Sequence, residues 1–303
     1  MALHPQARAA VAAYALEVPV FDPAFDIEAS RAEARALAAA EPREDVAEVA
    51  DLDADGVRCR LHRPAGADGL VVHLHGGGFV FHDVDVHDAV ARRLANRSGM
   101  AVLSVDYRRP PEHRFPAAPD DVDTVLGWLR REGPGRGLDL PTFVHGDSAG
   151  GNLALVAALR NPGRFAAVAL TYPFLDPSAG FDSYRTAADG FDPREAAWYW
   201  EQYVEPDRRT DPDVAPLLSD RLGSLPPTLV VTAEHDPLRD EGEELVRRLA
   251  EDGVEVVGTR YIGQVHGFWR HVDAFDAAEP LTRQLAAFLR QHRGERAAPS
   301  PIA

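Results

Sequence analysis

Ser148 stands at the centre of the pentapeptide Gly-Asp-Ser-Ala-Gly at residues 146–150, between two apolar runs. The run over 141–144 has the length of a buried strand, and the run over 152–159 has the length and composition of a helix. A serine on a tight turn from strand to helix exposes its hydroxyl above the sheet. Ser148 is therefore a candidate nucleophile, and the N–H of Ala149 in the first helical turn is a candidate donor to an oxyanion.

Three consecutive glycines form part of a second motif, His-Gly-Gly-Gly-Phe at residues 75–79, which follows a strand-like run over 70–74. Glycines at a strand end leave backbone N–H groups uncovered, so a carbonyl oxygen can approach them. A plain tight turn rarely needs three glycines. We therefore predict that N–H groups of this motif and of Ala149 form an oxyanion hole.

A nucleophilic serine needs a base, and the base needs a carboxylate that orients it. Asp236 follows the strand-like run over 228–231, and His266 follows the run over 254–262. Because both residues come just after consecutive strands, we expect them to meet at one edge of a sheet. His266 is the predicted base and Asp236 its predicted partner. The alternative carboxylates are Glu234 and Asp240.

The chain resembles the hormone-sensitive lipase family of esterases, also called bacterial type IV lipolytic enzymes, within the α/β-hydrolase fold. The resemblance extends from about residue 57 to the last helical segment. Five motifs in family order carry it: residues 75–79, 106–108 with 111–113 and 115–118, 146–150, 236–242 and 266–268. The sequence departs from the family at Arg109-Pro110, where Leu-Ala is more common, in a segment that we interpret as structural.

This resemblance implies a carboxylic ester hydrolase that forms an acyl-enzyme and needs neither a cofactor nor a metal. It assigns the triad to Ser148, Asp236 and His266. It assigns the oxyanion donors to the N–H groups of Gly76, Gly77 and Ala149. A small-molecule ester is the expected partner, and a homodimer is left open. An amidase or an acyltransferase with the same triad is the alternative, and a non-catalytic small-molecule receptor is disfavoured because His266 is present.

Alternating strand-like and helix-like runs predict an α/β fold with a mostly parallel central sheet that is flanked by helices. We expect a single α/β-hydrolase domain over 1–303, with a helical cap from about 1–45 and about 176–215. In the second cap segment, Trp198 and Trp200 are candidates for the wall of the substrate pocket; the alternative is that they fasten the cap to the core. A pocket bounded by such bulky rings predicts a preference for short to medium acyl chains.

The chain has 303 residues and a formal net charge of −16, and all 32 of its basic residues are arginines. This acidity excludes nucleic acid and anionic membranes as partners, because both require a basic surface. No apolar run approaches the roughly 20 residues that span a bilayer, and no signal peptide is recognisable. We therefore expect a cytoplasmic protein. The acidity is consistent with a GC-rich genome or with adaptation to salt.

Two patterns resemble metal sites, and we interpret neither as one. Residues 51–56 resemble the start of a calcium loop, but position twelve is His62 where a glutamate is required, so a hairpin turn at Asp55-Gly56 is expected instead. His73 and His75 share one face of a strand, without an evident third ligand. The single cysteine, Cys59, excludes an intramolecular disulfide.

Overall fold

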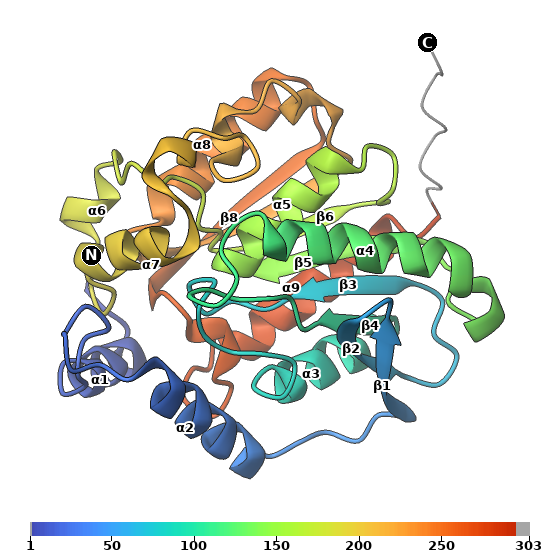
Figure 1. The fold of residues 1–303 in the computed structure, drawn as a ribbon, viewed down its shortest axis with the longest axis horizontal. Coiled ribbons are helices and arrows are strands. Elements are labelled where there is room, and N and C mark those ends of the chain that lie inside the picture. Colours follow the sequence, from blue (N-terminus) through green and yellow to red (C-terminus); the bar gives the residue numbers. More distant parts are fainter. Residues whose placement is uncertain (1, 295–303) are drawn as a thin grey trace.

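An eight-stranded sheet in the order β1-β2-β4-β3-β5-β6-β7-β8 forms the centre of the computed structural model, which describes residues 2–294 (Figure 1). Strands β3 to β8 run parallel, whereas β2 pairs antiparallel with both β1 and β4. The mostly parallel sheet predicted from the sequence is therefore confirmed. The strands are β1 (Glu48–Ala54), β2 (Val57–Arg63), β3 (Leu70–Leu74), β4 (Ala101–Val105), β5 (Thr142–Asp147), β6 (Val168–Thr171), β7 (Thr228–His235) and β8 (Val256–Val265).

The central strands are buried along their whole length and are mostly apolar, because both faces of the sheet are covered. Every residue of β3 to β7 is buried. Successive side chains of a strand point to opposite faces. Leu70 and Val72 accordingly belong to one core cluster and Val71 to the other. This double burial explains why these strands read as continuous hydrophobic runs rather than as alternating ones.

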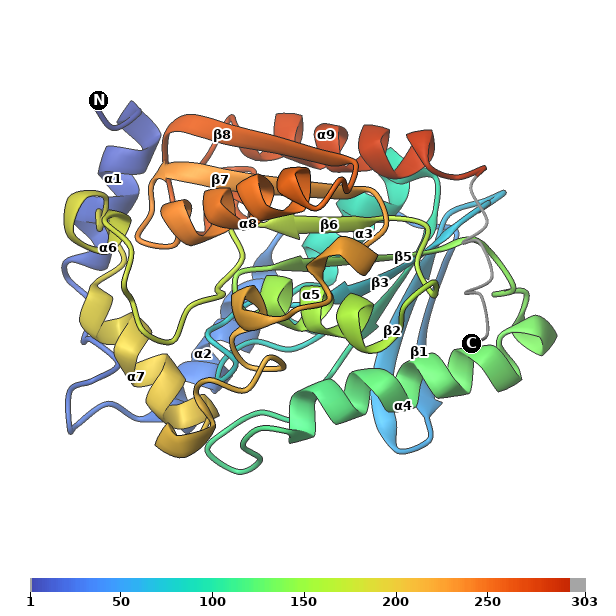
Figure 2. The same ribbon diagram turned by 90° about the horizontal axis from the view of Figure 1, so that it is seen from above.

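Helices cover both faces of the sheet (Figure 2). One core cluster contains apolar residues of α4, α5 and α8, and the other contains those of α3 and α9, which pack against each other. These helices are α3 (Asp88–Ser98), α4 (Ala117–Glu132), α5 (Ala149–Arg160), α8 (Arg239–Glu251) and α9 (Ala278–Gln291). Short 3-10 turns are η1 (Pro134–Arg136), η2 (Pro206–Arg208), η3 (Pro216–Leu218), η4 (Leu222–Ser224) and η5 (Phe268–Arg270).

The hairpin of β1 and β2 forms one edge of the sheet. Asp55 and Gly56 form its two-residue turn with φ angles of 55° and 92°. Two positive φ angles are what the tight turn between antiparallel strands requires, and an Asp-Gly pair tolerates them well. The predicted hairpin turn is confirmed at these two residues.

Four further helices lie together on one side of the molecule in both views (Figures 1 and 2): α1 (Pro5–Tyr14), α2 (Ile27–Ala40), α6 (Ser183–Thr186) and α7 (Pro193–Tyr203). We call residues 5–40 and 183–203, which contain these helices, the cap. Arg31 on α2 fastens it to the core, because its buried guanidinium donates to the carbonyl oxygens of Val80 and Pro110 at 3.0 and 2.7 Å.

The helices among residues 2–294 are either too short or too polar to cross a lipid bilayer.

Candidate active site

Ser148 occupies a strained turn between the end of β5 and the start of α5. Its φ and ψ angles are 55° and −122°, an unusual conformation for a residue with a side chain. Glycines on both sides make the turn possible. A Cβ on Gly146 would lie 2.0 Å from the carbonyl oxygen of Gly150, and a Cβ on Gly150 would lie 2.0 Å from that of Leu74. The strand and the helix can therefore pack closely enough to expose the serine hydroxyl above the sheet.

The structure brings Ser148, His266 and Asp236 into one hydrogen-bonded chain. The Nε2 of His266 lies 2.9 Å from the Oγ of Ser148, and its Nδ1 lies 2.8 Å from Oδ2 of Asp236. Asp236 is fully buried, and its Oδ1 accepts a hydrogen bond from the N–H of Leu238 at 2.9 Å. Because an ionised carboxylate can only accept, it holds the proton of His266 on Nδ1 and leaves Nε2 free to accept from the serine.

The two alternative carboxylates have other partners. Oε2 of Glu234 accepts from the N–H of Gly263 at 2.7 Å. Oδ2 of Asp240 accepts from the N–H of Ser183 at 2.8 Å. Both interactions hold loops around the site, so neither side chain is placed to orient His266.

The structure corrects one of the three predicted oxyanion donors. The N–H of Gly76 donates to Oδ1 of Asp147 at 3.0 Å, which leaves it unavailable to a substrate. Among residues 2–294, the N–H groups of Gly77, Gly78 and Ala149 have no acceptor. Gly77 and Gly78 also line the pocket beside Ser148, whereas Gly76 does not. The second and third glycines of the motif, rather than the first and second, thus have free N–H groups beside Ser148.

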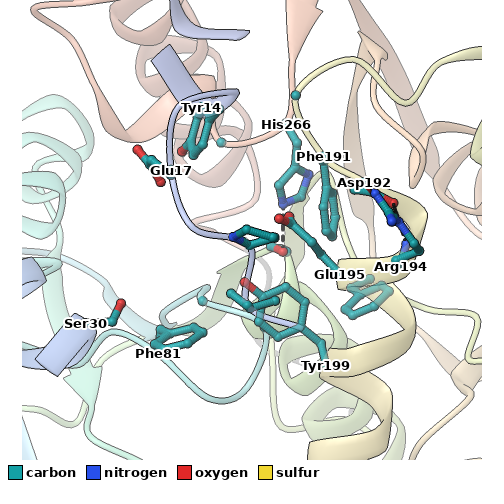
Figure 3. A pocket seen from close by; sticks show the side chains of 18 of the residues that line it. Tyr14, Glu17, Ser30, Phe81, Phe191, Asp192, Arg194, Glu195, Tyr199 and His266 are labelled. Carbon is teal, nitrogen blue, oxygen red and sulfur yellow. Dashed lines mark hydrogen bonds and ion pairs between the residues drawn. The ribbon is translucent and has the colours of Figure 1, made fainter. Parts of the chain in front are cut away.

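A cavity of about 770 Å³ lies above Ser148 and His266, between the strand ends and the cap (Figure 3). Aromatic side chains make up much of its wall: Tyr14, Phe21, Phe25, Phe81, Tyr172, Phe174, Phe191 and Tyr199. Three acids from the cap, Glu17, Asp192 and Glu195, also line it. This volume and mixed lining are typical of small-molecule sites.

Trp198 and Trp200, the two residues predicted to line the pocket, are not part of its wall. Trp200 is 1 % exposed and packs against Phe174, with ring centroids 4.4 Å apart. Tyr199 faces the cavity instead. Successive helical residues are rotated by about 100°, so only one of these three neighbours can point inward. Glu195, four residues earlier on α7, shares the face of Tyr199, a spacing that was visible in the sequence.

A cluster of buried histidines lies next to Asp147, the residue before Ser148. His73 lies 3.0 Å from His145 and 3.2 Å from His87, measured between ring nitrogens, while His87 lies 3.8 Å from Asp147. Ligand atoms of His73, His87 and Asp147 are close enough to hold a metal ion in principle. However, Nε2 of His73 already bonds to the ring of His87, and Oδ1 of Asp147 accepts from the N–H of Gly76. We therefore assign the cluster a structural role.

Burial determines the protonation states of these histidines and of Asp147. It lowers the pKa of His73 and His87 well below their usual range, so both rings are neutral at pH 7. It also raises the pKa of Asp147 to about 6, although Arg270 and the N–H of Gly76 act in the opposite direction. The carboxyl group that positions the glycine loop therefore titrates close to neutral pH.

Comparisons with known proteins identify the family and fold of the chain. Residues 71–270 match the model of the alpha/beta hydrolase fold family. The chain is 36 % identical to the carboxylic ester hydrolase LipN of Mycobacterium tuberculosis, across 88 % of this chain and 77 % of the relative. It is 33 % identical to an ethyl acetate hydrolase of Pseudomonas putida, across 77 % and 78 % of the two chains. A solved esterase of Pyrobaculum calidifontis superposes with a TM-score of 0.86 at 35 % identity, covering 96 % of this chain and 99 % of the other.

Proposed function

The chain belongs to the α/β-hydrolase family, among the carboxylic ester hydrolases related to hormone-sensitive lipase, and we propose that it cleaves esters of short to medium acyl chains through Ser148, His266 and Asp236. The observation that carries this proposal is the unbroken chain of hydrogen bonds from the Oγ of Ser148 through His266 to Asp236, at 2.9 and 2.8 Å. Ser148 and His266 lie in the wall of a cavity that several aromatic side chains line.

The reaction proceeds in two halves. In the first, Nε2 of His266 removes the proton from Ser148 as Oγ attacks the carbonyl carbon, and the N–H groups of Gly77, Gly78 and Ala149 stabilise the oxyanion. His266 then gives the proton to the departing alcohol, which leaves an acyl-enzyme. In the second half, His266 takes a proton from water, the resulting hydroxide attacks the acyl carbon, and Ser148 recovers its proton as the acid leaves.

The preference for acyl length follows from the bounded cavity. Each additional CH₂ that is buried contributes about 0.8 kcal/mol, and this gain ends when the cavity is full. The value of kcat/KM should therefore rise and then fall along a series of monomeric esters. A cytoplasmic location, a single domain with its cap and a homodimer stay predictions.

A fluorescent alkyl phosphonate tests the nucleophile, since it labels only an activated serine. Ser148→Ala should abolish both labelling and ester hydrolysis. Ser30→Ala is the matched control, because Ser30 also lines the pocket but has no histidine beside it (Figure 3). We expect this control to keep both activities. Labelling of Ser148→Ala at the level of the unmodified protein would overturn the assignment.

A further inference from the structure

The carboxyl group of Glu195 is a pocket feature that ester hydrolysis does not use. Its side chain points from α7 into the cavity toward His266 (Figure 3). Among residues 2–294 it accepts no hydrogen bond and forms no ion pair, although the charges of Arg194 and His266 act on it through space. The neighbouring cation, Arg194, is already engaged, because it pairs with Asp192 and lies over the ring of Phe21 at 4.5 Å. An acid in this position is free to bind a ligand.

Aromatic rings line the same cavity as this acid (Figure 3). The ring of Phe191 is centred 4.9 Å from that of His266 and 6.3 Å from that of Tyr199. Tyr199 in turn lies 6.1 Å from Phe81. The faces of aromatic rings attract cations, and quaternary ammonium groups are typically held in cages of this kind. The wall next to the triad thus combines a carboxyl group with several ring faces.

The other unpaired charge on the cap side of the cavity is also negative. Glu17, like Glu195, has no cation partner among the described residues. The remaining pocket cation, Arg270, donates hydrogen bonds to the rings of His82 and His271 at 2.9 and 3.2 Å. Burial, with added repulsion from Asp192 and Glu17, raises the pKa of Glu195 to about 7, although Arg194 and His266 act in the opposite direction. A cation that binds beside Glu195 would therefore stabilise its ionised form.

We propose that the pocket selects esters that carry an ammonium group, which Glu195 binds together with the rings of Phe191 and Tyr199. This inference rests on the proposed ester hydrolysis and names its substrate class. Glu195 acts on specificity and takes no part in the proton transfers between Ser148, His266 and Asp236.

Pairs of esters with the same shape and different charge test the proposal. Acetylcholine and 3,3-dimethylbutyl acetate place the ammonium group and its neutral carbon analogue on the alcohol side. Ethyl 4-(trimethylammonio)butanoate and ethyl 5,5-dimethylhexanoate place them on the acyl side. At pH 8, where Glu195 is ionised, kcat/KM should favour the charged ester about tenfold in at least one pair. Equal values within both pairs would refute the proposal.

Two variants assign such a preference to Glu195. In Glu195→Gln the ratio of charged to neutral ester should fall to about one. The matched control is Glu201→Gln, which makes the same change of charge on the exposed side of α7, outside the pocket wall, and should leave the ratio unchanged. A preference that survives Glu195→Gln, or that Glu201→Gln also removes, would contradict a local role of Glu195.

A binding measurement separates this inference from the proposed reaction. Acetylcholine titrated calorimetrically into Ser148→Ala should bind about tenfold more tightly than into Ser148→Ala with Glu195→Gln. Equal affinities would refute the ammonium site even if esters are hydrolysed. If instead the affinities differ and none of the four esters is hydrolysed, the ammonium site stands and the proposed hydrolysis fails.

Discussion

Asp147 connects the turn that bears Ser148 with the glycine motif over 75–79. It precedes Ser148, and its Oδ1 accepts the N–H of Gly76 at 3.0 Å. A Cβ on Gly76 would lie 2.5 Å from Oδ2 of the same carboxyl group, so the contact is closed to any larger residue. The side chain of Asp147, at the end of β5, therefore determines which glycine N–H groups remain free beside Ser148.

The buried position of Asp147 predicts a dependence of stability on pH. Its pKa is raised from 3.8 to about 6, so folding favours the protonated form. Below about pH 4 the group is protonated in both states and contributes nothing. Between about pH 4 and pH 6 the unfolded state loses this proton while the folded state keeps it, so on the order of 3 kcal/mol of stability is lost by the time the pH exceeds 6. Asp147→Asn, which keeps an oxygen for Gly76, should remove this loss.

The measurement is the free energy of unfolding of both proteins between pH 4 and pH 8. The variant should gain stability over the unmodified protein as the pH rises, and the two should converge near pH 4. Parallel curves would show that Asp147 is ionised without cost, and hence that burial does not control its pKa. Asp147→Ala, which removes the acceptor of Gly76, should be destabilised throughout this range.

The triad predicts a graded loss of activity. His266→Ala removes the base and should lower kcat by about 10⁶, whereas Asp236→Asn removes only its orientation and should cost about 10⁴. Because the residues act as a unit, the double variant should be little worse than His266→Ala alone. Glu234→Gln is the control, since Glu234 binds the N–H of Gly263 rather than His266. Near-full activity of Asp236→Asn beside a severe loss in Glu234→Gln would reverse the assignment of the acid.

At the scale of elements, one face of α7 lines the cavity and the neighbouring face packs against the core. Tyr199 faces the cavity and packs over the glycine loop, where a Cβ on Gly78 would meet its ring at 2.2 Å. Trp200 is buried on the neighbouring face against Phe79 and Phe174, with ring centroids 5.2 and 4.4 Å away. Tyr199 therefore bounds the cavity, and Trp200 holds the helix to the core.

Alanine substitutions on α7 should separate these two roles. Tyr199→Ala should move the optimum of kcat/KM toward longer acyl chains, because it enlarges the cavity. Trp200→Ala should leave that optimum in place and lower the stability by about 3–5 kcal/mol, the usual cost of removing a large buried ring. Chain-length profiles and melting temperatures of both variants provide the check. A shifted optimum in Trp200→Ala would mean that it lines the pocket after all.

Elements of this fold differ in how far the sequence reveals them. The buried strands are continuous apolar runs, and the loops that bear Asp236 and His266 follow such runs directly, so both could be predicted. Strand β1 is largely exposed and carries three acidic residues, and the sequence gives no comparable signal for it. The sequence did not reveal that the N–H of Gly76 is engaged, because this depends on a contact with Asp147, 71 positions away. Such a long-range contact leaves no periodic pattern.

At the scale of the whole molecule, charge is the dominant feature. The net charge of −16 produces repulsion that disfavours any compact state. Arginine side chains offset part of it through ion pairs, among them the Arg160 contacts with Asp120, Asp123 and Asp213 at 2.9–3.0 Å. The Arg160 side chain is half-buried, whereas exposed pairs such as Arg185 with Asp182 contribute only about 0–1 kcal/mol each and weaken in salt. The response to salt therefore depends on whether the repulsion or the pairs carry more energy.

We expect the repulsion to dominate, so that added salt stabilises the protein at neutral pH. Raising NaCl from about 0.01 to 0.5 M shortens the screening length from about 30 Å to a few ångströms. This change suppresses the long-range repulsion of the excess acids, and the melting temperature at pH 7.5 should rise by several degrees. The control is the same titration at pH 5.1, the isoelectric point, where the excess charge vanishes and only the weakening of ion pairs remains. There the melting temperature should stay constant or fall. A rise of equal size at both pH values would identify a general salting effect and contradict the charge argument.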